Sequence, residues 1–164
     1  LKHIPNEEEV FYVFLSIIEN KMPINFYSEM CGLMADVDIM IKILYFFCPA
    51  LCHHLVEFDL LDFLKNLLLQ WFLSVFTHNF NDEFNVFILD LFFVQGSVVL
   101  FKVAYYLIKE SEEKLMMATN LIELKSILDR SGKNQIWSSE LAGLKLKMLE
   151  EFILDDNVLN MNRN

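Results

Sequence analysis

The stretch LLLQWFLSVFTHNFNDEFNVFILDLFFVQGSVVLFKVAYYLI, residues 67–108, decides the fold of this chain. Its only fully charged side chains are Asp82, Glu83, Asp90 and Lys102, so it cannot stay in contact with water along its length. It divides into three apolar segments, one ending near residue 78, one from 84 to 94 and one from 98 to 108. We therefore expect this stretch to form the core.

The residues between the three segments favour helices. Asn81 can accept a hydrogen bond from the first free backbone N–H groups of a helix. Gly96 can adopt the left-handed conformation that ends a helix, and Ser97 then follows as the cap of the next one. Between Ser97 and Lys109 the only charged side chain is Lys102, so neighbouring helices must cover this segment on most sides. The pattern predicts an all-α, multi-helix irregular bundle.

Composition and charge narrow the function classes. The chain is 55% hydrophobic with sixteen Phe, above the roughly 45–50% apolar content of ordinary soluble domains. The longest uncharged run, residues 66–81, contains polar residues and is shorter than the ~20 apolar residues that a membrane span needs. The net charge of −10 argues against nucleic acid and anionic lipid as partners and is compatible with a basic protein surface.

The N-terminus favours a fragment without a secretory signal. Glu7, Glu8 and Glu9 stand where a signal peptide would be basic and then apolar. The chain starts at Leu1 and not at Met, so we expect it to be a piece of something longer.

Outside the central stretch the pattern predicts further helices and no strands. Two capping boxes, Asn6 to Glu9 and Asn120 to Glu123, mark helix starts. Residues 132–138 are predicted to be a linker, followed by an additional helix and a polar tail in 139–164. The predicted helices are 7–21, with a stripe of Val10, Phe11, Phe14, Ile17 and Ile18; a short turn or helix from Pro23 closed by Gly32; 36–47; 49–58; 59–64, capped by Asp59; 111–118, capped by Ser111; 121–130, ended by Gly132; and 139–154.

No constellation indicates an active site. Cys48, Cys52, His53 and His54 share a short helix but do not share one face, and a zinc site draws its ligands from two converging elements. Cys31, Cys48 and Cys52 are interpreted as reduced, buried thiols of a cytosolic protein. There is no Gly-x-Ser-x-Gly motif and no Gly-rich phosphate loop. We expect no catalytic residues, no metal and no cofactor in this chain.

Three segments carry a family pattern. They are residues 7–28, EEEVFYVFLSIIENKMPINFYS, residues 44–58, LYFFCPALCHHLVEF, and residues 69–115. The matches are P-x-L-x-x-H-L at Pro49, Leu51, His54 and Leu55; Q-W-F-L-x-x-F at Gln70, Trp71, Phe72, Leu73 and Phe76; and W-D-x-F-F-x-x-G-S-x-V-L-F-x-V-A at Asp90, Phe92, Phe93, Gly96, Ser97, Val99, Leu100, Phe101, Val103 and Ala104. Over about residues 7–130 the chain resembles the C-terminal half of the TBC domain of Rab GTPase-activating proteins. Leu89 departs from the tryptophan of that pattern.

The resemblance implies a function but places its chemistry elsewhere. The family uses an arginine from I-x-x-D-x-x-R and a glutamine from Y-x-Q, and both motifs lie in the N-terminal half of its domain. Neither motif occurs here, and the only arginines are Arg130 and Arg163. Arg130 is not favoured as a substitute because it lies far past the matching region. By resemblance, residues 1–131 are the C-terminal lobe of a Rab-GTPase-activating domain that takes part in vesicle trafficking.

The resemblance also implies partners. A Rab-type small GTPase would bind the complete domain in the cytoplasm, peripheral to endomembranes, and other protein partners are compatible with the chain. For GTPase contact we name Trp71, Ser74 and His78, which share one helical face at i, i+3 and i+7. The other interpretation, that Trp71 belongs to the core, is the favoured one. A non-catalytic TBC-like interaction or scaffold module is the alternative function.

Overall fold

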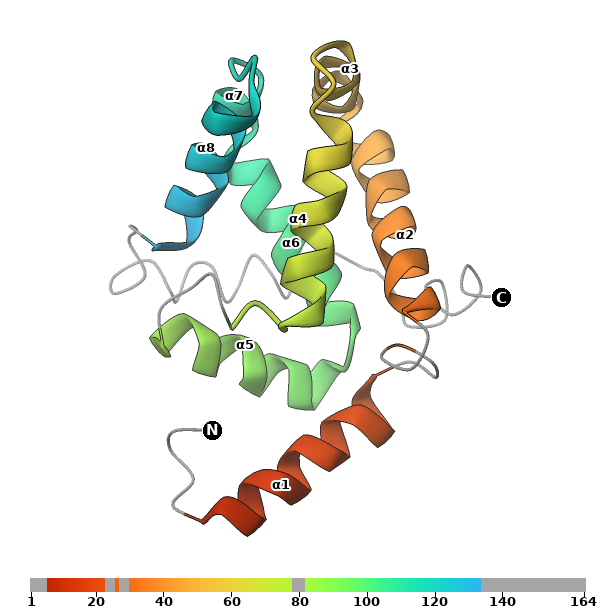
Figure 1. The fold of residues 1–164 in the computed structure, drawn as a ribbon, viewed down its shortest axis with the longest axis vertical. Coiled ribbons are helices and arrows are strands. Elements are labelled where there is room, and N and C mark those ends of the chain that lie inside the picture. The colour runs from red at the N-terminus through yellow and green to blue at the C-terminus, as the bar shows by residue number, and fades with distance from the viewer. Residues whose placement is uncertain (1–5, 23–25, 27–29, 78–81, 134–164) are drawn as a thin grey trace.

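The computed structural model describes residues 6–22, 26, 30–77 and 82–133 of the chain. Within these ranges every regular element is a helix, which confirms the all-α prediction (Figure 1). The elements are α1 (Glu7–Ser16), the π-helical turn η1 (Ile17–Lys21), α2 (Cys31–Phe47), α3 (Pro49–Glu57), α4 (Leu61–Leu73), α5 (Asp82–Gln95), α6 (Val98–Glu110), α7 (Glu112–Leu115) and α8 (Leu121–Lys133).

Helix α6 is the centre of the bundle. It packs against α2, α4, α5, α7 and α8, as the sequence predicts for a helix with one charged side chain in its middle. Figure 1 shows α2 and α4 side by side, α8 beyond α6, α5 crossing at the lower end, and α1 beyond α5. The buried residues of α6 occupy most of its circumference: Val98, Val99, Leu100, Phe101, Val103, Ala104, Leu107 and Ile108.

An aromatic cluster joins α4 to α6. The ring centroid of Phe72 lies 5.3 Å from that of Phe101, and the ring of Phe76 lies 5.6 Å from Trp71. These four side chains are at most 1% exposed. Each large aromatic side chain adds a large apolar area to the core, so the central stretch is the core as predicted.

The boundaries of α2 to α4 differ from the prediction. Helix α2 begins at Cys31, so Gly32 lies inside its first turn and does not close a preceding helix. Asp59 does not cap a separate short helix. It has φ +55° and ends α3 in a Schellman motif, because the N–H of Leu60 donates to the carbonyl of Leu55 at 2.7 Å. A single helix then runs from Leu61 to Leu73.

The apolar run expected to continue to residue 78 ends earlier. After Leu73 the chain turns through Val75 (φ +48°) and Phe76 (φ +62°), and the N–H of Phe76 donates to the carbonyl of Trp71 at 2.8 Å. A β-branched residue with positive φ is rare. The burial of Val75 and Phe76 holds the backbone in this conformation.

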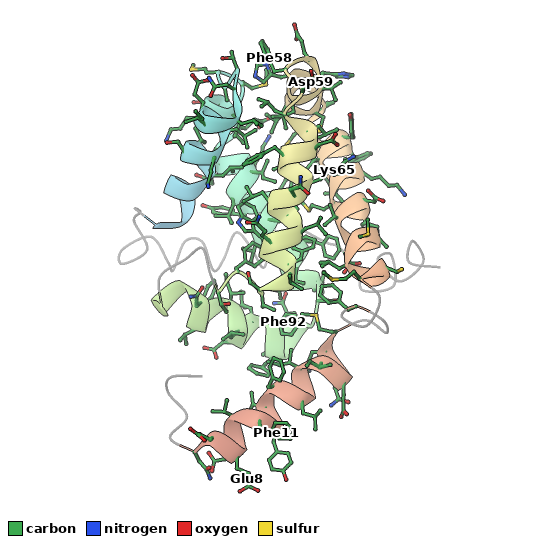
Figure 2. The ribbon with its side chains drawn as sticks, in the orientation of Figure 1. Glu8, Phe11, Phe58, Asp59, Lys65 and Phe92 are labelled. Carbon is green, nitrogen blue, oxygen red and sulfur yellow. The ribbon has the colours of Figure 1, made fainter. Side chains whose placement is uncertain are left out.

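Helix α1 forms at the predicted place but does not bury the predicted stripe. Of that stripe only Ile17 is buried, whereas Phe11 and Phe14 are 59% and 51% exposed. In the described part of the chain α1 contacts η1, and η1 contacts α5 (Figure 2 labels Phe11 on α1 and the buried Phe92 of α5). The outer face of α1 is therefore apolar and exposed.

Helix α8 starts as predicted and ends later. The Asn120 side chain accepts a hydrogen bond from the N–H of Glu123 at 3.0 Å. In a standard capping box the Glu123 carboxylate would accept from the N–H of Asn120, but here it accepts from the N–H of Thr119 at 2.9 Å. The helix continues through Gly132 to Lys133, two residues into the predicted linker 132–138. The predicted helix 139–154 and the polar tail lie outside the described residues.

No single helix among the described residues has both the length and the apolar character needed to cross a bilayer, although the sharply bent pair of α2 and α3 passes a test of length and composition.

Gly96 tests the turn between α5 and α6. It has φ +72°, and a Cβ added to it would meet no atom within 4 Å, so any cost of substitution comes from the backbone alone. We expect Gly96→Ala to lower the free energy of unfolding by about 1 kcal/mol and Gly96→Asn to lower it less, because Asn tolerates the left-handed region. Urea unfolding followed by circular dichroism measures both. An Ala variant as stable as the parent would contradict the strain argument.

Glu123 tests the cap of α8. The hydrogen bond from the Thr119 N–H, followed by that of Asn120, holds the pKa of Glu123 below its ordinary value of 4.5. A lowered pKa in the folded state adds stability above pH 4.5, and this stability is lost as the pH falls through the folded value. We expect the urea midpoint of the parent to fall more steeply below pH 4.5 than that of Glu123→Gln. Glu113→Gln, at an exposed position on α7, is the matched control and should keep the parent slope.

Candidate partner-binding surface

Of the three residues named for GTPase contact, the structure describes Trp71 and Ser74. Trp71 is 1% exposed, and its ring packs at 5.6 Å from the ring of Phe76. Ser74 is the C-cap of α4, half-buried, and its Oγ donates to the carbonyl of Gln70 at 2.8 Å. His78 lies outside the described residues. Helix α4 ends at Leu73, and Trp71 offers almost no surface to a partner.

The family-motif residues divide into three groups. Pro49 occupies the first turn of α3 and Gly96 ends α5, so both set helix boundaries. Trp71, Phe76 and Phe101 fill the core. The others reach solvent: Gln70 and Asp90 are exposed and Phe93 is 37% exposed. Most of these motif residues therefore serve packing and turn geometry.

The cysteines differ from one another. Cys48 and Cys52 are buried as expected, but Cys31 is exposed at the start of α2, which corrects the prediction of three buried thiols. Burial raises the pKa of both buried thiols, with Glu112 adding to the effect at Cys48 and with Cys52 reaching about 11. A thiol that stays protonated is a poor nucleophile.

Polar contacts tie α3 to the neighbouring elements. Lys109 Nζ lies 2.6 Å from Glu112 Oε2 and 3.8 Å from Cys48 Sγ. His54 Nε2 donates to the carbonyl of Ala118 at 2.8 Å. These contacts join α3 to α6 and to the connection between α7 and α8. Within the described ranges no group of three or more His, Cys, Asp or Glu could hold a metal ion.

The structure shows a groove that the sequence patterns did not identify. It lies between α2 and α4 and has a volume of about 300 Å³. Its apolar lining is Met34 and Val37 from α2 and Leu69 from α4. Its polar lining is Asp38 from α2 and Asp62, Lys65 and Asn66 from α4. These residues recur at helical spacings of three and four, a signal that becomes useful only once the two helices are known to be neighbours.

An exposed aromatic group at the end of α2 was also missed. Phe46 is 80% exposed and Phe47 is 47% exposed, and their rings lie 4.9 Å apart. The ring of Phe47 also lies 5.5 Å from that of Tyr105 on α6. The sequence pattern predicts a helix over 36–47, but it does not show that the last turn of this helix faces solvent.

Comparison with known proteins adds the family. The model of the Rab-GTPase-TBC domain matches residues 1–116. The Small G protein signaling modulator 3 homolog of Xenopus laevis is 30% identical over 115 residues, which are 70% of this chain and 15% of that protein. The GTPase-activating protein gyp2 of Schizosaccharomyces pombe is 32% identical over 114 residues, 70% of this chain and 16% of that protein.

A third relative, TBC domain-containing protein C4G8.04 of Schizosaccharomyces pombe, is 28% identical over 128 residues, 75% of this chain and 16% of that protein. The aligned part of this chain thus spans about 15–16% of the length of these relatives. No solved structure matches. The matched region contains helices α1 to α7 and all the motif residues described above, and the chain belongs to the Rab-GTPase-TBC domain family.

Proposed function

We propose that this chain is the C-terminal lobe of a domain that accelerates GTP hydrolysis by a Rab-type small GTPase, with the arginine and glutamine fingers on residues outside this chain. The family match over residues 1–116, together with the absence of both finger motifs from the sequence, carries the proposal. One relative is named a GTPase-activating protein, and we extend that activity to the complete domain here.

The chemistry requires groups that this chain lacks. In GTP hydrolysis an arginine neutralises the charge that develops on the transferring phosphoryl group, and a glutamine orients the attacking water. No tyrosine in this chain has a glutamine two residues later. The role of this lobe is then to support the catalytic part and to provide some of the contact surface, with Ser74 and His78 as candidates and Trp71 acting through the core.

The outer face of α1 supports a lobe that packs against more protein. Phe11 and Tyr12 are 59% and 60% exposed, and Phe14 is 51% exposed on the same short helix. Three large aromatic side chains in water favour association, because each buries enough apolar surface to stabilise a contact. We assign this face to the half of the domain that carries the fingers.

For the complete protein we also propose a place of action. It works in the cytoplasm, at the surface of endomembranes, in vesicle trafficking.

Single-turnover GTP hydrolysis by a panel of Rab GTPases tests the proposal. We expect this chain alone to give no acceleration, because an arginine finger supplies on the order of 10³–10⁵ in rate and none is present here. A longer chain that continues upstream of Leu1 and carries both finger motifs should accelerate at least one GTPase.

Two controls make the outcomes decisive. Acceleration by this chain alone would overturn the placement of the fingers, and Arg130→Ala would then show whether Arg130 is responsible. If the longer chain carries no finger motifs, or carries them and leaves every hydrolysis rate unchanged while still binding a GTPase, the non-catalytic scaffold replaces the enzyme.

A further inference from the structure

The groove between α2 and α4 combines an apolar floor with an unbalanced negative charge. Its volume of about 300 Å³ is at the lower end of the range typical of binding pockets. The two helices pack along their length and run side by side, so the walls of the groove belong to regular elements (Figure 1). Met34 is 59% exposed at its edge, although it is a large apolar side chain.

The charges of the groove leave one carboxylate available. Lys65 Nζ lies 3.4 Å from Asp62 Oδ1, so Lys65 neutralises the acid on its own helix (Figure 2 labels Lys65 on α4). Asp38 is exposed and has no ion-pair partner in the described part of the chain. The groove therefore carries a net charge of −1 on a protein whose net charge is −10, which favours a cation as its occupant.

The shape of the lining favours a side chain that is apolar along its stem and cationic at its tip. Met34, Val37 and Leu69 can cover methylene groups, while Asp38 accepts hydrogen bonds from the charged head and the Asn66 side chain offers a further acceptor. Arginine matches this arrangement better than lysine, because its planar guanidinium binds a carboxylate through two parallel N–H groups and still has donors for a second acceptor.

We propose that this groove binds an arginine side chain presented by a partner protein, flanked there by apolar residues. The stem of the arginine lies on Met34, Val37 and Leu69, and its guanidinium pairs with Asp38. This docking surface goes beyond the role in GTP hydrolysis. It does not depend on the finger residues, and it holds for the chain as it stands even if no GTPase is accelerated.

Methyl NMR of the chain labelled at its methionine methyl groups tests the proposal. The probes are the capped peptides acetyl-Leu-Arg-Leu-amide, acetyl-Leu-Lys-Leu-amide and acetyl-Leu-Gln-Leu-amide. We expect the Arg peptide to shift the Met34 methyl signal with saturation on the order of 1 mM, since a single side chain makes few contacts. The Met117 methyl, 79% exposed outside the groove, is the internal control and should not move.

Two variants should change the affinity in opposite directions. Asp38→Asn removes the carboxylate and should weaken binding of the Arg peptide about tenfold. Lys65→Met keeps an apolar stem but removes the ion pair with Asp62, so the groove becomes more negative. This change should tighten binding of the Arg peptide several-fold. Asp90→Asn, an equal change of charge at an exposed position on α5, is the matched control and should leave the affinity unchanged.

The outcomes separate clearly. Binding of the Arg peptide that exceeds binding of the Lys and Gln peptides, and that weakens in Asp38→Asn, supports the proposal. Equal shifts with the Gln peptide, equal movement of Met34 and Met117, or an unchanged affinity in Asp38→Asn would overturn it. Far-UV circular dichroism of each variant keeps unfolding apart from loss of binding. None of these readings involves GTP hydrolysis, so failure here is distinct from failure of the proposed function.

Discussion

The structure depends on the burial of α6 from almost every side. A helix with one charged residue, Lys102, between Ser97 and Lys109 is stable in water only when other helices remove its surface from solvent. Lys102 itself is half-buried and its Nζ donates to Gln95 at 2.9 Å, so even the charged position is used to join α6 to the end of α5. The high apolar content of the chain follows from this requirement, since each covering helix needs its own apolar face.

Much of the fold could be predicted from the sequence because its signals are local. The Asn120 cap, the glycine at position 96 and the proline at position 49 each act within one turn of a helix, and each is found at the predicted boundary. The failures have a common physical cause. Asp59 and Val75 adopt positive φ although neither is glycine, and for the β-branched Val75 the burial of Val75 and Phe76 compensates the strain. Such tertiary compensation leaves no pattern in a single sequence.

The candidate sites were harder to predict than the fold for a related reason. Spacing places Trp71 and Ser74 on one face of a helix, but it does not show whether that face meets protein or water. In the structure Trp71 is in the core and the helix ends before it can include residue 78. The groove between α2 and α4 likewise combines residues such as Asp38 and Lys65 that are distant in sequence. Surfaces of this kind come from the arrangement of helices, and the exposed aromatic face of α1 is another example.

The bond between His54 and Ala118 has a consequence for the behaviour of the protein in solution. A backbone carbonyl can only accept, so the imidazole must carry a hydrogen on Nε2. The contact therefore fixes the orientation of the His54 ring, and any ligand that takes Nε2 must first separate α3 from the chain segment before α8.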